Sequence, residues 1–346
     1  MNIIPKRILI ARTDRLGDVV LSTPVIRYFR EKYPDSYIAF MTRPYARDIV
    51  KNDPYIDEVI LYDKDYSHKS LFGTIRFALS LKGKRFDTAI ALHPTNRTHL
   101  IFYAAGIPAR IGYDRNLPFL LTKRIKHAKQ EGLMHEIDYN FDLLEKAGFD
   151  TSGADKMPYI EKDDSDSKVV DAILTDQGIS GEMVAVHAGA SCPSKRWPPE
   201  KFAEVCDALA AMRGYSVILV GGEETEKFSR QVMMSMKAKA HDLTDILRVG
   251  ELAELLRRCR LFISNDSGPV HVSVAVGTPV ISIFGRKDPG LSPKRWGPVG
   301  ENDVVIHKDA GCVECLAHNC FRGFACLESV TVEEVMDAVR KILGSR

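Results

Sequence analysis

The chain has 346 residues, of which 45% are hydrophobic and 27% charged, with a formal net charge of +2. This length accommodates two domains with full cores, and the small net charge excludes nucleic-acid binding driven by bulk charge. No apolar run reaches the roughly 18 residues of a membrane-spanning helix, and the N-terminal run is too short for a secretory signal, so we expect a cytoplasmic protein.

The first half alternates short apolar runs with helical stretches, which is typical of βαβ units and a parallel sheet. We predict strands at 7–11, 36–43, 56–62, 86–93 and 109–114, one helix ending near residue 34, and helices at 46–52 and 71–84. Residues 150–167 are polar and turn-rich without a sustained period, which predicts an interdomain linker.

The second half repeats the alternation. We predict strands at 183–190, 215–222, 261–266 and 279–285, and helices at 198–212, 224–237, 252–259, 268–277 and 331–343, with Thr331 as the last N-cap. The sequence therefore predicts an α/β fold of two doubly wound domains, over residues 1–160 and 161–346. In such sheets ligands bind beyond the carboxyl ends of the strands, so we expect the ligand site in a cleft between the domains.

The first strand is followed by the turn "RTDRLGDVVLSTP", which contains Gly17 but lacks the three glycines of a dinucleotide fingerprint. This argues against a dehydrogenase. The turn carries two acids instead, Asp14 and Asp18. We expect Asp18 at a helix N-terminus, where the dipole would lower its pKa and keep it ionised. Asp14 is an alternative base, although its position favours an Asx turn.

The stretch "FISNDSGPVHVSVAVGTPVISIFG" predicts a phosphate site. Asp266, Ser267 and Gly268 form the turn into a helix, whose free N–H groups and dipole favour an anion, and His271 lies one turn further on. The alternative is a capped core helix with a hydrogen-bonded histidine. That alternative does not explain the choice of residues in "SGPVH".

Two more turns follow strands in the second half. "HAGASCPSKRWPPEKF" places Lys195 after a small-residue turn, where a cation could neutralise a diphosphate leaving group, although a solvated basic loop is equally consistent. "VGGEETEKF" offers Glu223 and Glu224 as hydrogen-bond acceptors for a ribose or a base. Acids in the first turn of a helix are the simpler explanation for that pair.

Four cysteines fall within fifteen residues near the C-terminus, at Cys312, Cys315, Cys320 and Cys326. A Cys-x-x-Cys pair with two further thiols could hold zinc or an iron–sulfur cluster, although the spacing is less regular than in a zinc ribbon. Reduced thiols and a labile disulfide are the alternatives, and we assign no metal from the sequence.

In combination, the four turns resemble those of the ADP-heptose:lipopolysaccharide heptosyltransferases, glycosyltransferase family 9, from about residue 6 to the C-terminal helix. The resemblance implies a GT-B architecture of two Rossmann-like domains, the first binding the acceptor and the second the sugar nucleotide, with a last helix that can pack back on the first. It implies a metal-independent, inverting transfer from ADP-heptose to a lipid-linked anionic oligosaccharide of the lipopolysaccharide inner core. Transient contact with the inner face of the cytoplasmic membrane is implied as well.

The resemblance also implies residue roles. Asp18 falls on the general base and Lys195 on the diphosphate-contacting lysine, and Ser191 aligns with a hydroxyl near the phosphates. The nucleotide turn falls on Asp266, Ser267, Gly268 and His271. Glu224 is the ribose- or adenine-side carboxylate, with Glu223 as a competitor.

The acceptor side is marked by cations at or after the predicted strands of the first domain, which favour an anionic acceptor as a group. They are Arg12, Arg15, Arg43, Arg47, His93, Arg97 and Arg115. Three other functions are considered. The first is a GT-B glycosyltransferase that uses another sugar nucleotide. The second is a nucleotide-sugar 2-epimerase, whose first turn would differ, and the third is a non-catalytic nucleotide-binding protein, which would not need Asp18.

Overall fold

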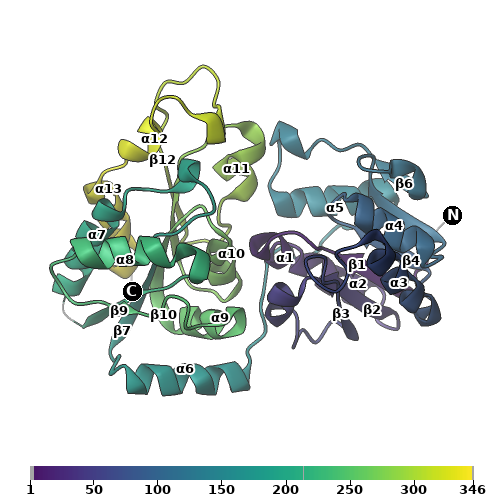
Figure 1. Ribbon diagram of the computed structural model, residues 1–346, viewed down its shortest axis with the longest axis horizontal. Helices are drawn as coiled ribbons and strands as arrows, with labels where there is room; N and C mark the ends of the chain where they lie inside the picture. The colour runs from purple at the N-terminus through teal and green to yellow at the C-terminus, as the bar shows by residue number, and fades with distance from the viewer. Residues whose placement is uncertain (1–3, 213, 345–346) are drawn as a thin grey trace. The chain divides into compact units, whose positions relative to one another are not determined.

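The computed structural model describes residues 4–212 and 214–344 and divides the chain into two compact units. The first unit comprises residues 1–130 and 134–161, and the second comprises residues 131–133 and 162–346. Each unit is built around its own parallel sheet (Figure 1). Among the described residues, none of the helices has the length and apolar character needed to cross a bilayer.

The first unit contains a six-stranded parallel sheet in the order β3-β2-β1-β4-β5-β6. Its strands are β1 (Arg7–Ala11), β2 (Tyr37–Thr42), β3 (Glu58–Leu61), β4 (Thr88–Ala91), β5 (Ala109–Tyr113) and β6 (Lys123–Ile125). Its helices are α1 (Leu16–Val20), α2 (Thr23–Lys32), α3 (Leu71–Leu81), α4 (Asn96–Ala104) and α5 (Glu136–Ala147), with 3₁₀ turns η1 (Pro44–Ile49), η2 (Lys82–Lys84) and η3 (Pro118–Leu120). The turn η4 (Lys129–Glu131) spans the boundary between the units.

The central strands are continuous apolar runs because parallel strands with helices on both faces are buried on both sides. In β1, Ile8, Leu9 and Ile10 are fully buried. Ile10 lies opposite Phe40 of β2 and Ile90 of β4, so the register aligns the apolar runs of the three central strands.

The second unit contains a six-stranded parallel sheet in the order β12-β11-β10-β7-β8-β9. Its strands are β7 (Glu182–His187), β8 (Tyr215–Leu219), β9 (His241–Asp242), β10 (Cys259–Asn265), β11 (Val280–Phe284) and β12 (Val304–His307). Its helices are α6 (Asp164–Asp176), α7 (Pro199–Ala211), α8 (Glu226–Ser235), α9 (Val249–Arg258), α10 (Gly268–Ala275), α11 (Pro293–Trp296), α12 (Ala325–Glu328) and α13 (Val332–Gly344), with 3₁₀ turns η5 (Pro193–Lys195), η6 (Glu223–Thr225), η7 (Pro289–Leu291) and η8 (Ala317–Asn319).

The main core of the second unit lies on one face of its sheet, under α7, α8 and α13 (Figure 1). The last helix begins with a capping box: the Thr331 hydroxyl accepts from the backbone N–H of Glu334 at 3.2 Å, and the Glu334 carboxylate accepts from the backbone N–H of Thr331 at 3.0 Å. This confirms Thr331 as the N-cap. The apolar face of α13, including Val335 and Val339, is buried in the core of its own unit.

Some predicted elements differ in detail. Residues 164–167, assigned to the linker, already belong to α6, because the Asp163 carboxylate accepts from the backbone N–H groups of Ser165 and Asp166 and starts a helix there. The predicted helix before residue 34 is two helices, α1 and α2. The helix expected at 46–52 is the 3₁₀ turn η1. Helices α4, α5, α6, α11 and α12 and strands β6, β9 and β12 were not predicted.

Counted from its own first strand, each sheet has the order 3-2-1-4-5-6 of a Rossmann fold. The strand order reverses between β1 and β4 in the first unit and between β7 and β10 in the second. In open α/β sheets this reversal opens a crevice at the carboxyl ends of the two strands, where ligands bind. The predicted site turns follow β1, β7, β8 and β10, and those after β1, β7 and β10 lie at the two reversals.

Candidate functional site

The crevice of the first unit holds Asp18 on α1. This short helix starts after the extended N-cap Arg15, and Asp18 lies in its first turn. The carboxylate is only 8% exposed and is paired with the guanidinium of Arg12, which directly follows β1. The turn therefore fixes Asp18 against a buried cation rather than leaving it in solvent.

Arg12 is the centre of a buried charge cluster, which we define as Arg12, Asp14, Asp18, Lys129 and Glu136. Its Nε donates to Asp14 Oδ1 at 2.7 Å, and one terminal nitrogen donates to Glu136 Oε1 at 3.0 Å. Lys129 Nζ lies 2.5 Å from the same Glu136 oxygen, and Glu136 is fully buried. Three carboxylates thus share two cations, so the cluster carries one surplus negative charge when all its acids are ionised.

Burial and the neighbouring Asp14 charge raise the pKa of Asp18, Arg12 opposes both, and the resulting pKa is about 6. The expectation of a lowered pKa is therefore wrong, because burial and the surplus charge outweigh the helix dipole. A carboxylate with this pKa is mostly ionised at neutral pH and has more proton affinity than an ordinary aspartate, which suits a general base.

His93 follows β4 and completes the crevice. Its Nδ1 lies 3.3 Å from Asp14 Oδ2. Burial, with the positive charge of Arg12, lowers the pKa of His93 to about 3, so the imidazole is neutral. His93 therefore contributes hydrogen bonding rather than positive charge at physiological pH.

The other predicted acceptor cations follow the carboxyl ends of parallel strands, but they are not equivalent. Arg12 is buried in the charge cluster, so its assignment as an acceptor-contacting cation is wrong and its contacts are with protein carboxylates. Arg97 donates to backbone carbonyls, and Arg43 pairs with Asp65. The exposed members of the set are Arg15, Arg47 and Arg115.

The crevice of the second unit contains the N-terminus of α10. Ser267 is the extended N-cap, yet its side chain does not cap the helix. Its hydroxyl lies 2.9 Å from the Ser264 hydroxyl and 3.1 Å from His187 Nδ1, at the end of β7. The first turn of α10 thus has the uncapped N–H groups and the positive dipole end that favour an anion.

Two cations converge on Asp266 beside this helix. Asp266 Oδ2 lies 2.5 Å from an Arg286 terminal nitrogen and 3.1 Å from Lys195 Nζ. Burial lowers the pKa of Lys195, and the charge of Asp266 opposes that shift. One carboxylate holding two cations leaves a net positive charge, the reverse of the balance in the first unit. We call Lys195, Asp266, Arg286 and the N-terminus of α10 the cation cradle.

Hydrogen bonds hold the β7 and β10 turns together. Asn265 accepts from the backbone N–H of Trp197 at 2.9 Å and donates to the Ala188 carbonyl at 2.7 Å. Gly189 has no room for a side chain, because a Cβ there would lie 2.4 Å from the Thr225 side chain. Burial lowers the pKa of His187 to about 4, so it joins this network as a neutral imidazole.

The remaining predicted residues lie around the same crevice. His271 is buried on α10, whereas Ser191, Glu223 and Glu224 are exposed. Both glutamates lie on η6 directly after β8, which leaves their carboxylates accessible to a ligand. The structure does not distinguish Glu224 from Glu223.

Sequence reasoning missed Arg286, Lys129 and Glu136. Arg286 had a signal, because a cation just beyond the strand run "PVISIFG" falls at the ligand-binding edge of a parallel sheet. Lys129 and Glu136 had none, since 124 residues separate Arg12 from Glu136 and only the tertiary fold joins them.

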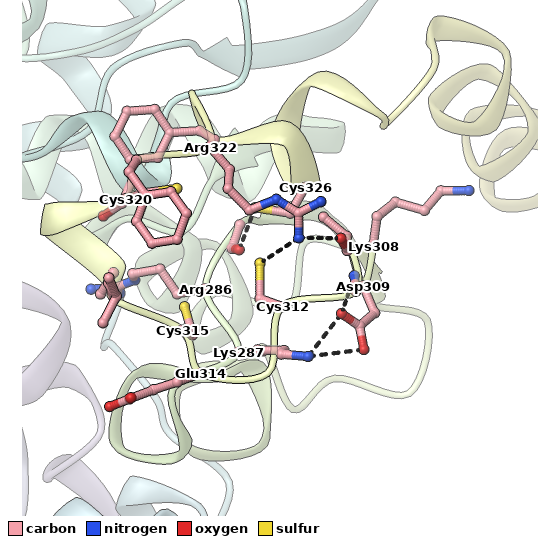
Figure 2. Close-up of a pocket in the computed structure, with 18 of the residues that line it drawn as sticks. Arg286, Lys287, Lys308, Asp309, Cys312, Glu314, Cys315, Cys320, Arg322 and Cys326 are labelled. Atoms are coloured by element: carbon pink, nitrogen blue, oxygen red, sulfur yellow. Dashed lines mark hydrogen bonds and ion pairs between the residues drawn. The ribbon is translucent and has the colours of Figure 1, made fainter.

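The four clustered cysteines lie elsewhere in the second unit and line one cavity (Figure 2). Among residues 4–212 and 214–344, no three His, Cys, Asp or Glu side chains are already arranged to hold a metal ion. Neither crevice therefore presents a ready-made metal site in the described part of the chain.

Comparison with known proteins matches residues 74–324 to the family described as Glycosyltransferase family 9 (heptosyltransferase). Lipopolysaccharide heptosyltransferase 3 of Escherichia coli (strain K12) is 28% identical over 344 residues, which cover 94% of this chain and 95% of that protein. A glycosyl transferase family 9 structure from Veillonella parvula DSM 2008 superposes with a TM-score of 0.85 at 27% identity and covers 99% and 98% of the two chains.

A more distant structure has the same fold. The iron-containing dodecameric heptosyltransferase TibC, in complex with ADP-D-β-D-heptose, superposes with a TM-score of 0.59 at 14% identity, covering 99% of this chain and 76% of that one. The neighbours are GT-B heptosyltransferases, and the two Rossmann-like units of this chain have the same architecture.

Proposed function

Because this chain belongs to glycosyltransferase family 9, the heptosyltransferases, we propose that it transfers heptose from ADP-heptose to an anionic sugar of the lipopolysaccharide inner core. The observation that carries the proposal is the opposite chemistry of the two crevices. One holds a carboxylate whose pKa is about 6, and the other holds a net positive cradle at a helix N-terminus. The family match disfavours the epimerase alternative.

The cation cradle suits the donor. Lys195 and Arg286 would compensate the negative charge that develops on ADP as the bond to the anomeric carbon breaks, and the N–H groups at Gly268 would contact the phosphates. Asp266 orients both cations, which fits its place in the nucleotide turn. Around this centre we propose Ser191, Ser267 and His271 near the phosphates and Glu224 at the ribose or adenine.

Asp18 suits the base. It would accept the proton of the acceptor hydroxyl as that oxygen bonds to the anomeric carbon and ADP departs from the opposite face, which gives inversion in one displacement. Arg12 fixes the orientation of the Asp18 carboxylate, and Glu136 in turn orients Arg12 by accepting a hydrogen bond from it. This division assigns the acceptor to residues 1–160 and the donor to residues 161–346, and it requires both halves to act on one anomeric carbon.

We propose an anionic acceptor because its negative groups would pair with the exposed arginines of the first unit. Arg15, Arg47 and Arg115 lie beyond the carboxyl ends of β1, β2 and β5, where they would meet phosphates or carboxylates of a lipid-linked core oligosaccharide. Such an acceptor would bring the enzyme to the inner face of the cytoplasmic membrane from the cytoplasm, through surface contact.

The test is a reconstituted transfer assay. The purified chain is incubated with ADP-heptose and a heptose-deficient core acceptor, with ADP-glucose and UDP-glucose as control donors. We expect ADP release matched by an acceptor one heptose heavier in mass spectrometry. ADP-heptose hydrolysis without transfer to any anionic core acceptor, or equal use of UDP-glucose, would contradict the proposal.

A further inference from the structure

A loop of the second unit carries chemistry that neither crevice uses. Between β12 and α13, a segment that the structure describes throughout, the regular elements are η8 and α12, each a single turn. Large apolar side chains in this segment are exposed: Val313 fully and Phe321 by 83%. A segment of this length with so little buried apolar surface lacks a core of its own, and metals or disulfides commonly order such segments.

All four cysteines of the segment line the same cavity of about 470 Å³, although fourteen positions separate the first from the last. Figure 2 shows Cys312, Cys315, Cys320 and Cys326 around one hollow. In the sequence two of them precede η8 and two follow it. Each is free in this structure. The other three cysteines of the chain, Cys192, Cys206 and Cys259, are not among the lining residues.

Charged side chains surround the thiols, and one of them, Arg322, contacts a thiol directly. The cavity is lined by four basic side chains, Arg286, Lys287, Lys308 and Arg322, and two acidic ones, Asp309 and Glu314. Arg322 donates to Cys312 Sγ at 3.4 Å. Arg286 pairs with Asp266, Lys287 with Asp309 and Lys308 with Glu334, whereas Arg322 contacts a thiol and would hydrogen-bond the same sulfur once it is a metal-bound thiolate.

From the shared cavity, the four free thiols and the contact of Arg322 with Cys312, we propose that Cys312, Cys315, Cys320 and Cys326 bind one thiophilic metal ion, zinc or iron, that orders this loop. Binding replaces four S–H bonds by four metal–sulfur bonds and releases four protons to solvent, without oxidation or reduction. Since the thiols are not preassembled, the ion has to draw the loop together as it binds.

The site would be structural for the donor crevice rather than catalytic. Arg286 of the cation cradle lines the cavity, and the Cys326 thiol donates to the backbone carbonyl of the adjacent Gly285 at 2.7 Å. His318 of η8 lies 3.3 Å from the hydroxyl of Ser194, next to Lys195. A metal ion that orders the loop would therefore also order the residues next to Lys195 and Arg286, the two cations of the cradle.

The experiment measures metal content, which is independent of activity. The full chain is produced with zinc or iron supplied, or reconstituted anaerobically with each, and analysed by elemental mass spectrometry. We expect about one ion per chain for the unaltered protein, and less than a tenth of that for Cys320→Ser and for Cys312→Ser. Cys192→Ser, a partly exposed cysteine outside the cavity, is the matched control and should keep the full content.

A second measurement uses the unaltered chain, in case a serine variant does not fold. A thiol reagent should modify four more cysteines after a chelator is added than before, and Co²⁺ should give a thiolate-to-metal charge-transfer band. Metal below a tenth of an ion per chain in both reconstitutions would overturn the proposal. So would unchanged content in Cys320→Ser, or four thiols released by a reductant but not by a chelator, which would indicate disulfides.

Discussion

The two units share one sheet topology but have opposite charge balances at the point where the strand order reverses. Both sheets reverse their strand order at the centre, and both place their charged turns at that reversal. In the first unit three carboxylates share two buried cations, whereas in the second unit one carboxylate holds two. The fold therefore determines where a ligand binds. A few side chains determine whether the crevice there exchanges a proton with the ligand or stabilises an anion.

The largest expected effect concerns the proton acceptor. We expect Asp18→Asn to lower kcat by 100-fold or more, the usual scale for a lost general base, because an amide cannot take the proton of the acceptor hydroxyl. Steady-state transfer measured by ADP release checks this. Turnover close to that of the unaltered enzyme would remove Asp18 from the mechanism.

The next effect concerns the cradle. Arg286→Met keeps the length of the side chain and removes its charge, and Asp266 keeps Lys195 as a partner. We expect ADP affinity to fall roughly 10- to 100-fold, the range for one lost charged hydrogen bond, which calorimetric titration measures. Arg260→Met, which removes a cation paired with Glu182 at the start of β7, is the control and should bind ADP normally.

The pH dependence of the reaction follows from the raised pKa of Asp18. A base has to be ionised, so kcat/KM should rise about tenfold per pH unit below about pH 6 and level off above it. An acidic limb near pH 4, as for an ordinary aspartate, would show that burial and the surplus charge do not raise the pKa of the base.

A smaller change to the charge cluster should shift the acidic limb of the pH profile without removing the general base. Glu136→Gln keeps the shape of the side chain and takes one negative charge out of the cluster, so the pKa of Asp18 should fall. We expect the acidic limb of kcat/KM to shift to lower pH, with ADP affinity unchanged. A purely structural role for Glu136 would reduce the amount of folded enzyme and leave the position of the limb where it was.

The sequence predicted what local patterns determine. Continuous apolar runs predicted the buried central strands. Parallel strands bring their carboxyl ends to one edge, so the turns after β1, β7, β8 and β10 were assigned to ligand binding, and that assignment stays a prediction. The sequence also predicted the capped start of α13, since a capping box is contained in four residues.

The predictions that were wrong or missing concern features without a clear local pattern, several of which depend on residues far apart in the sequence. Helix α6 was missed because its first turn is acidic and resembles a linker until Asp163 is seen to cap it. The pKa of Asp18 was predicted in the wrong direction because its burial, which raises the pKa most, and the approach of Glu136 both depend on the tertiary fold. β9 has two residues, too few for a periodic signal.

The division of labour between the units is tested most directly by ADP binding to Asp18→Asn and Lys195→Met in parallel, measured by calorimetry on the same preparations used for turnover. The account predicts that Asp18→Asn binds ADP as the unaltered enzyme does while its turnover collapses, and that Lys195→Met loses ADP affinity. Equal loss of ADP affinity in both variants would contradict a separate base and a separate cradle.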